Sequence, residues 1–405
     1  MSGLNFMDKL LNGYEFQWKA LGDIGTFIRG SGIQKSDFRE VGAGCIHYGQ
    51  IHTHYGTWAT ETKSFISHEF SARLRKAHTG DLIIATTSED DEAVAKAVAW
   101  LGAEDVAVST DAYIYRHKAN PKYMSYFFQT ELFQSQKKLH ITGTKVRRIS
   151  GDKLAKIQIP IPCPGNPKKS LEIQAEIVRV LDTFAALATE LTAELTAELI
   201  AHEKQYNYYR DQLLSFEDGQ VEWKTLGDLA ENLDSMRRPI TSGLRVAGET
   251  PYYGASGIVD YVKDYIFDGD LLLVSEDGAN LLARNTPIAF SISGKSWVNN
   301  HAHVLKFDTY ANRKYVEYYL NSIDLTPYIS GAAQPKLNKK NLESISIPNP
   351  SPEEKKRIVA NLDKLHAVTN SITDSLPREI ELRKKQYEHY RELLLNFPKP
   401  EQAEA

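Results

Sequence analysis

The chain has 405 residues, 42% of them hydrophobic and 10% aromatic, with a formal net charge of −4. This length suits two or three domains, and the composition is that of a globular protein rather than a disordered one. The sequence offers no apolar run long enough to span a membrane, no secretory signal, and too few cysteines for a disulfide framework or a zinc site. We therefore expect a cytoplasmic protein with no metal site and no cofactor.

Several short motifs occur twice along the chain, in the same order. They are a Trp-Lys-x-Leu-Gly-Asp turn, an Ile-Pro strand, an Ile-Val-x-x-Leu-Asp segment, a Lys-Gln-Tyr-x-x-Tyr-Arg segment and an Asp-x-Leu-Leu segment. Their positions are 18–23 and 223–228, 154–162 and 342–350, 177–182 and 358–363, 204–210 and 385–391, and 8–11 and 211–214. Repetition on this scale indicates two copies of one structural plan.

Each copy is expected to contain short strands and turns, a short helix, a basic loop and an Ile-Pro strand. Apolar runs predict buried strands at Asp81–Ala85 and Asp270–Val274. The short helices are predicted at Pro121–Lys137 and Arg313–Asn321. Clusters of prolines then mark a domain boundary in each copy, because proline ends ladders and helices.

A long helix is predicted after each proline cluster, roughly at Leu171–Phe216 and Pro352–Phe397. Apolar residues in the first helix keep a spacing of three or four, which gives it one face to bury against a partner, most economically the other long helix. Pro377 should either kink the second helix or break it. The predicted division is a domain, a helix, a second domain, and a helix with a tail, at residues 1–167, 168–216, 217–351 and 352–405.

This plan resembles the specificity subunit of type I restriction–modification enzymes, over essentially the whole chain. The tetrapeptides at 188–191, 192–195 and 196–199 look like the Thr-Ala-Glu-Leu spacer repeat of one subfamily. The resemblance implies an α+β fold, in which two target-recognition domains are joined by two long antiparallel helices in a pseudo-twofold arrangement. It also implies a non-catalytic protein that binds double-stranded DNA at a bipartite asymmetric site. Its partners would be two methyltransferase (modification) subunits and motor–nuclease (restriction) subunits.

Helix geometry agrees with a spacer of this kind. Each tetrapeptide adds about 6 Å of helix, against about 3.4 Å per base pair of duplex. Three tetrapeptides favour the family's longer gap of roughly seven unspecified base pairs, between half-sites about one helical turn apart. The segments Arg29–Lys76 and Ala230–Lys263 have no clear likeness to each other. We therefore expect two different half-sites.

Basic loops at equivalent places supply the first candidates for DNA contact. Lysine and arginine neutralise phosphates, and arginine and glutamine can each form two hydrogen bonds with the edge of a base. The candidates are Lys145, Arg147 and Arg148 in residues 142–148, and Gln334, Lys336 and Lys339 in residues 330–340. The alternative is a solvated basic turn.

Further candidates lie on glycine-containing turns and on a polar segment. They are His47, Tyr48, Gln50, Tyr253, Ser256, Asn280, Arg284, Asn299 and His301. Purely structural turns are the alternative for those that flank glycines. Asn299, His301 and His303 alternate along an apparent strand and would share one face. A polar reading face and an ordinary exposed strand both remain open, and a metal site is disfavoured because no cysteine or carboxylate lies near them in sequence.

Motifs of catalysis are missing from the sequence. Gly294-Lys-Ser296 ends like a phosphate-binding loop, but Ala289 stands where the required glycine should be. Methyltransferase and dinucleotide motifs are absent as well. Two alternatives remain, a stand-alone bidentate DNA-binding or architectural protein, and a nuclease or methyltransferase with unrecognised motifs. The near-neutral charge disfavours the stand-alone binder, although the acidic segment 171–216 offsets basic surfaces elsewhere in the total.

Overall fold

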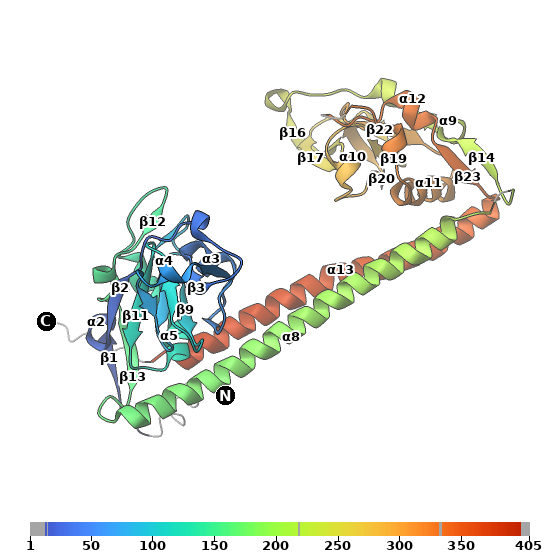
Figure 1. The fold of residues 1–405 in the computed structure, drawn as a ribbon. Helices are drawn as coiled ribbons and strands as arrows, with labels where there is room; N and C mark the ends of the chain where they lie inside the picture. The colour runs from blue at the N-terminus through green and yellow to red at the C-terminus, as the bar shows by residue number, and fades with distance from the viewer. Residues whose placement is uncertain (1–12, 14, 218, 332–333, 398–405) are drawn as a thin grey trace. The chain divides into compact units, whose positions relative to one another are not determined.

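The computed structural model describes residue 13 and residues 15–217, 219–331 and 334–397 (Figure 1). Its backbone divides into two compact units. The first unit joins Met1–Ala193 to Glu379–Ala405, and the second unit is Glu194–Arg378. Each unit holds one globular part of strands and short helices, together with half of each long helix. The predicted α+β fold with two such parts and two long helices is confirmed. The predicted motif at residues 8–11 lies outside the described residues.

In the described part of the first unit there are two main sheets and two smaller strand pairs. One sheet has the order β2-β11-β7-β9-β4, with strands Gly25–Arg29, Ala112–His117, Leu82–Ala85, Ala97–Trp100 and Trp58–Ala59. The other has the order β5-β3-β10-β6, with strands Ser64–Ile66, Ala43–Ile46, Val106–Val108 and Lys76–Ala77. The pairs are β1 with β13 and β8 with β12, at Phe16–Ala20, Gln158–Pro162, Thr87–Ser88 and Arg147–Arg148.

β7 lies inside the predicted segment Asp81–Ala85 and is buried on both faces. Leu82 and Ile84 contribute to one apolar cluster, and Ile83 and Ala85 contribute to another. Successive side chains of a strand point to opposite faces, so a continuous apolar run suits a strand between two cores.

Short helices of the first unit lie between these strands. They are α2 (Leu21–Ile24), η1 (Lys35–Asp37), α3 (Tyr48–Thr53), α4 (His68–Ser71), α5 (Pro121–Phe127), α6 (Glu131–Lys138) and α7 (Gly151–Leu154). The single helix predicted at Pro121–Lys137 is wrong, because α5 ends before α6 begins. The hydroxyl of Thr130 accepts a hydrogen bond from the Phe133 N–H, which caps a new helix at this point.

The second unit repeats the plan with two four-stranded sheets. The first sheet, β15-β22-β19-β20, has strands Glu231–Asn232, Ala302–Lys306, Leu271–Ser275 and Ala289–Ile292. The second, β17-β16-β21-β18, has strands Gly257–Val262, Ala247–Gly254, Lys295–Val298 and Phe267–Asp268. The remaining pair is β14 with β23, at Glu222–Thr225 and Ser346–Asn349. β19 is buried, as predicted for the segment Asp270–Val274.

Short helices of the second unit follow the same order. They are α9 (Leu226–Leu229), η2 (Asp234–Met236), η3 (Ser242–Leu244), α10 (Asn280–Ala283), α11 (Tyr310–Ser322), η4 (Thr326–Tyr328) and α12 (Lys339–Glu343). The helix predicted at Arg313–Asn321 is therefore present and begins three residues earlier. Thr309 starts it by accepting a hydrogen bond from the Asn312 N–H.

The long helices are α8 (Pro167–Leu214) and α13 (Pro352–Leu395). Both begin with a proline, which suits the first turn because its missing N–H would have no helical partner there. α13 continues through Pro377, so the helix is not broken there, although one backbone hydrogen bond is lost. Among the described residues, none of the helices carries the long apolar stretch that crossing a membrane requires.

A tyrosine of a short helix donates a hydrogen bond to an aspartate of a long helix in both units. In the first unit, Tyr126 of α5 donates to Asp182 of α8 at 2.7 Å. In the second unit, Tyr318 of α11 donates to Asp363 of α13, also at 2.7 Å. Burial raises the pKa of both tyrosine hydroxyls, and the bond to a carboxylate raises it further. Both tyrosines therefore stay neutral and donate.

The other long helix completes each of these contacts. Tyr387 of α13 lies beside Tyr126 in the first unit, and Tyr206 of α8 lies beside Tyr318 in the second. Tyr206 and Tyr387 are equivalent residues of the repeated Lys-Gln-Tyr motif. Each long helix thus gives its aspartate to one unit and its tyrosine to the other, as the predicted pseudo-twofold arrangement requires.

Replacing Tyr126 with Phe should lower the free energy of unfolding of the first unit by about 1–2 kcal/mol. The change removes the hydroxyl that bonds the Asp182 carboxylate and contacts Tyr387, and it keeps the buried ring. Denaturant unfolding measures the loss. Tyr209→Phe is the matched control, because the Tyr209 side chain lies on the exposed surface of α8. Equal stability of the two variants would contradict the expectation.

Candidate nucleic-acid interface

Loops from distant parts of the second unit meet at one end of its sheets. This second loop cluster consists of the β16–β17 turn, the segment after β19, the β21–β22 turn and the described part of the basic loop, at residues 254–257, 276–284, 299–301, 330–331 and 334–338. The Ser275 hydroxyl donates to the Ala255 carbonyl at 2.5 Å. The Glu276 N–H donates to the His301 carbonyl at 2.9 Å, and the Leu337 N–H donates to the Glu276 carbonyl at 2.8 Å.

The first unit brings equivalent segments together. This first loop cluster consists of α3, the segment after β7, the β10–β11 turn and the basic loop, at residues 48–53, 86–92, 109–111 and 142–148. The Tyr48 N–H donates to the Ser109 hydroxyl at 2.8 Å, and the His52 Nε2 lies 3.0 Å from the Thr87 carbonyl. Strand β8 pairs with β12 and joins the segment after β7 to the basic loop.

The basic loop has the same backbone closure in both units. Thr142 and Arg148 exchange two backbone hydrogen bonds, at 2.9 and 2.8 Å. Ser330 and Lys336 exchange two of the same kind, both at 2.8 Å. The recurrence shows that the loop belongs to the common plan, whereas the residues it displays differ between the copies.

A glycine is required at the second position of each loop. Gly143 has a φ of +91° and Gly331 a φ of +84°, in the left-handed region that favours glycine. A Cβ on Gly143 would lie 2.1 Å from the Val146 carbonyl oxygen, and one on Gly331 would lie 2.6 Å from that of Gln334. These glycines close the loops.

The candidates of the first unit lie either at the start of α3 or in the basic loop. His47 accepts a hydrogen bond from the Gly49 N–H through Nδ1 at 3.2 Å, and burial lowers the pKa of its imidazole. The Gln50 side chain accepts from the His47 N–H at 3.1 Å and donates to Ser64 at 2.6 Å. His47 and Gln50 thus hold the start of α3, and Tyr48 is half-buried beside them.

The cations of the first basic loop are more accessible. Lys145 and Arg148 are exposed. Arg147 is half-buried, lies 2.9 Å from Asp91 and donates to the Gly143 carbonyl at 2.6 Å. Lys145 and Arg148 therefore reach solvent, whereas Arg147 supports the loop.

Two candidates of the second unit hold backbone instead of facing solvent. Both ends of the Asn280 amide bond the backbone of Thr286, each at 3.0 Å. Arg284 donates to the carbonyls of Leu320 and Ile323 at the end of α11. A cation at a helix C-terminus also interacts favourably with the partial negative charge of the helix dipole there. Arg284 therefore acts as a cap.

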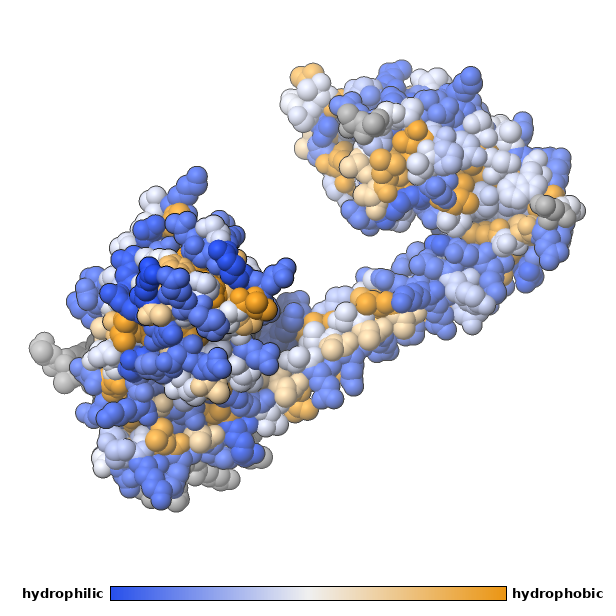
Figure 2. Space-filling model, viewed as in Figure 1, coloured by the Kyte–Doolittle hydropathy of each residue, from blue (hydrophilic) through white to orange (hydrophobic). Residues whose placement is uncertain are grey.

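Most of the remaining candidates in the second basic loop and in the β16–β17 hairpin are exposed. Ser256 lies in the β16–β17 turn, and Tyr253 is half-buried beside it. Gln334, Lys336 and Lys339 are exposed, although Lys336 lies 3.1 Å from Glu276 and Lys339 lies 3.6 Å from Glu343. Apolar residues also reach the surface of this hairpin, as the orange patch over it in Figure 2 shows; they include Val246, Ile258 and Val259.

The predicted strand face of Asn299, His301 and His303 is wrong. β22 begins at Ala302, so only His303 belongs to the strand, and it is buried. Asn299 and His301 lie in the β21–β22 turn, where the Asn299 side chain accepts from the His301 N–H at 2.8 Å. The exposed His301 instead lies 2.8 Å from Asp277.

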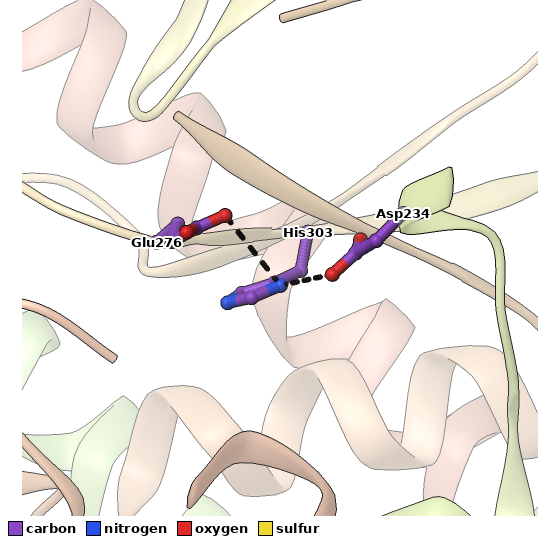
Figure 3. A group of neighbouring side chains, drawn as sticks. All are labelled: Asp234, Glu276 and His303. Atoms are coloured by element: carbon purple, nitrogen blue, oxygen red, sulfur yellow. Dashed lines mark hydrogen bonds and ion pairs between the residues drawn. The ribbon is translucent and has the colours of Figure 1, made fainter. Parts of the chain in front are cut away.

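Buried charges around His303 form a cluster that sequence reasoning missed (Figure 3). His303 Nδ1 lies 2.6 Å from Asp234, and Glu276 lies 3.8 Å from the same nitrogen. The Arg237 guanidinium bridges both carboxylates, at 3.3 Å from Asp234 and 2.5 Å from Glu276. Lys336 adds its contact with Glu276 from the basic loop. The sequence contains no spacing signal for this cluster, because its members come from η2 and the residue after it, the segment after β19, β22 and the basic loop.

The donor set of one histidine and two carboxylates is also that of a metal site. The Arg237 guanidinium contacts both carboxylates and supplies positive charge between them, as a metal cation would. Arg237 and Lys336 already balance the two carboxylates. We therefore treat the residues as an ion cluster.

Both carboxylates of the cluster are stabilised in their charged form. Burial raises the pKa of Asp234, but hydrogen bonds from His303 and the Val304 N–H and the charge of Arg237 outweigh it and lower the pKa. Burial likewise raises the pKa of Glu276, and hydrogen bonds from Arg237 and Lys336 outweigh it. The cluster is thus held together by charge rather than by neutral hydrogen bonds.

These shifts predict how acid affects the second unit. A carboxyl with a lowered pKa contributes its full stability above its ordinary pKa, 3.8 for aspartate and 4.5 for glutamate, and loses it as the pH falls through the lowered value. The stability of the second unit should therefore fall below about pH 4.5. In Asp234→Asn, the unfolding free energy at pH 7 should be lower and the acid loss smaller. Denaturant unfolding between pH 7 and pH 3 measures both, and an unchanged acid slope would contradict the assignment.

Comparison with known families identifies both copies. A family model for the type I restriction modification DNA specificity domain matches residues 14–201 and again residues 220–382. The two matches correspond to the two repeats.

Individual relatives agree with the family model. The chain is 40% identical over 272 residues to the EcoR124I/EcoR124II type I restriction enzyme specificity subunit of Escherichia coli, over 60% of this chain and 64% of that protein. It is 39% identical over 238 residues to the EcoprrI specificity subunit of Escherichia coli, over 58% of each. The matched part of the chain thus covers less than two thirds of these relatives.

A solved structure shares the fold across the chain. It comes from a study of complex assembly and conformational transition in the type I restriction–modification system, with a TM-score of 0.69 at 16% identity, and covers 94% of this chain and 97% of that one. At this identity the likeness concerns the fold. Two successive matches to one family model, together with the repeated fold, establish that the chain belongs to the type I restriction–modification DNA specificity family.

Proposed function

We propose that this chain is the non-catalytic sequence-recognition subunit of a type I restriction–modification enzyme. Each loop cluster reads one half of a bipartite, asymmetric DNA site. The observation that carries this proposal is the loop cluster itself, which is built twice on the same backbone plan with different residues. A shared backbone with different exposed residues in each loop cluster suits the recognition of two different half-sites.

The exposed loop residues have the chemistry that DNA binding needs. Lys145 and Arg148 in the first cluster and Lys336 in the second lie on loops that reach solvent. Cations at such positions neutralise phosphates, whereas Gln334 and Ser256 offer neutral groups for base edges or phosphates. His47, Gln50, Asn280 and Arg284 support this surface by holding its backbone.

The partners follow from the family. We propose that the chain works in the cytoplasm, with two adenine-methyltransferase subunits for modification and with motor–nuclease subunits for restriction. The near-neutral charge supports dependence on partners, because a solitary binder would need more cationic surface to hold DNA at physiological salt. DNA binding by the isolated chain should be weak and should rise sharply with the methyltransferase.

The tetrapeptides of α8 set the distance between the half-sites in this proposal. We favour a gap of roughly seven unspecified base pairs for three tetrapeptides. Mapping of methylated adenines by long-read sequencing, in cells with this chain and its methyltransferase, tests the whole proposal. A split asymmetric motif is expected. Methylation at a compact or palindromic motif, or methylation that persists without this chain, would overturn it.

Deletion of Thr196–Leu199 should shorten the gap by one or two base pairs and leave both half-site sequences unchanged. Four residues span about 6 Å of helix, against about 3.4 Å per base pair. The same methylation map reads the result. A gap that stays constant in a folded, active deletion variant would show that these tetrapeptides do not set the spacing.

Replacing Lys145 and Arg148 together with Ala should weaken DNA binding by the methyltransferase complex. If both contact phosphates, the slope of log affinity against log salt should fall by about two, and the loss should be similar for all sequences. Lys118→Ala is the control, because this exposed lysine follows the end of β11 away from the first loop cluster. An equal effect of the control would place the DNA elsewhere.

A further inference from the structure

The second basic loop is anchored to the sheet through one buried residue. Leu337 is buried, and its N–H donates to the Glu276 carbonyl at 2.8 Å. Its own carbonyl lies 2.7 Å from the Nε2 of His303. The neighbouring residues Gln334 and Lys336 are exposed. The position of the exposed loop therefore depends on what holds Leu337.

Both ring nitrogens of His303 face acceptors. Nε2 faces the Leu337 carbonyl, which can only accept, and Nδ1 faces the Asp234 carboxylate at 2.6 Å. A neutral imidazole has one N–H and would leave one nitrogen lone pair against an oxygen. An imidazolium has an N–H on each nitrogen and can donate to both acceptors.

Charged groups surround His303 and would stabilise an imidazolium in this buried place. Asp234 and Glu276 are the anions, and Arg237 and Lys336 are the other cations. With a charged His303 the group carries three positive and two negative charges, and Lys336 extends from it to solvent. The buried histidine thus joins the exposed cation of the loop in one charge network.

The first unit anchors its loop without such a histidine. The Ile149 N–H donates to the Thr86 carbonyl at 3.1 Å, which matches the bond of Leu337. In the same register Tyr113, which pairs with Ile84 of β7, stands where His303 pairs with Val274 of β19. The Tyr113 ring packs edge-on against Phe27, and a tyrosine has no imidazolium to place between a carboxylate and the loop. The ion cluster is therefore a feature of the second copy, and the first copy anchors its loop differently.

We propose that His303, as an imidazolium between Asp234 and the Leu337 carbonyl, is a positioning residue for recognition of the second half-site. It holds residues 334–337 in the conformation that presents Gln334 and Lys336. This role rests on the proposed function, in which the second basic loop reads a DNA half-site. The first half-site does not depend on it.

Two variants of His303 separate its two hydrogen bonds. The short side chain of His303→Asn can reach toward Asp234 but not to Leu337. The longer side chain of His303→Gln can place its amide near the position of Nε2 and keep the donor to Leu337. Exchange of the backbone amides of residues 334–337, measured by mass spectrometry on the full chain, should be about tenfold faster in His303→Asn, as expected for loss of a hydrogen bond to a charged group. It should be closer to the native rate in His303→Gln.

Controls are available within the same chain. Exchange of residues 142–148 should not change in either variant. His301→Asn removes an exposed imidazole from the same loop cluster and should leave the exchange of residues 334–337 unchanged. In the native chain, NMR with ¹⁵N-labelled histidine should detect two ring N–H protons for His303. A single ring N–H proton on His303 would overturn the proposal. Because this measurement uses the native chain, it applies even if His303→Asn fails to fold.

The functional measurement is methylation by the complex on DNA with base changes in either half-site. In His303→Asn, discrimination should fall about tenfold at the second half-site and stay unchanged at the first. Unchanged loop exchange in a folded His303→Asn would overturn the positioning role and leave the proposed function intact. Faster exchange with unchanged discrimination would mean that the loop does not read DNA, which would count against the proposed function at this loop.

Discussion

The hydrogen bond between a buried tyrosine and an aspartate of a long helix is the contact on which each unit depends. Asp182 and Asp363 occupy the same position in the repeated motif, and each accepts from a tyrosine of the neighbouring short helix. Because the opposite long helix adds Tyr387 or Tyr206 to the same place, neither unit is complete without segments from both helices. This requirement ties the two halves of the sequence to one design.

The frame fixes where loops emerge, and the loops are free to differ. The basic loop closes through the same pair of backbone hydrogen bonds and a left-handed glycine in both units. Around that common closure the first unit uses Arg147 with Asp91, and the second uses an ion cluster with a buried histidine. Different stabilising chemistry behind the same loop allows different exposed residues without a change of fold, which suits a protein that reads two different sequences.

The sequence indicated which loops lie near one another but said less about individual side chains, and their contact with DNA stays a prediction. The two basic loops and the turns near Gly49 and Gly254 do gather at the ends of the sheets, because the repeated motifs mark equivalent places in each copy. Gln50, Asn280 and Arg284 have polar groups typical of base contacts, yet the structure uses them to hold backbone. The type of a side chain limits which hydrogen bonds it can form, whereas the groups around it determine which of them it forms.

The amino-acid sequence alone determined the two-copy plan, the buried central strands, the long helices and the family, because these depend on local periodicity and on repeated motifs. Only the tertiary structure decided how His303 is used. The alternation of Asn299, His301 and His303 looked like one exposed face, but the strand begins at Ala302 and turns His303 into the core. There it meets Asp234, Arg237 and Glu276, which lie far from it in sequence and carry no shared spacing. Contacts between distant segments depend on how the sheet folds, and local patterns do not encode them.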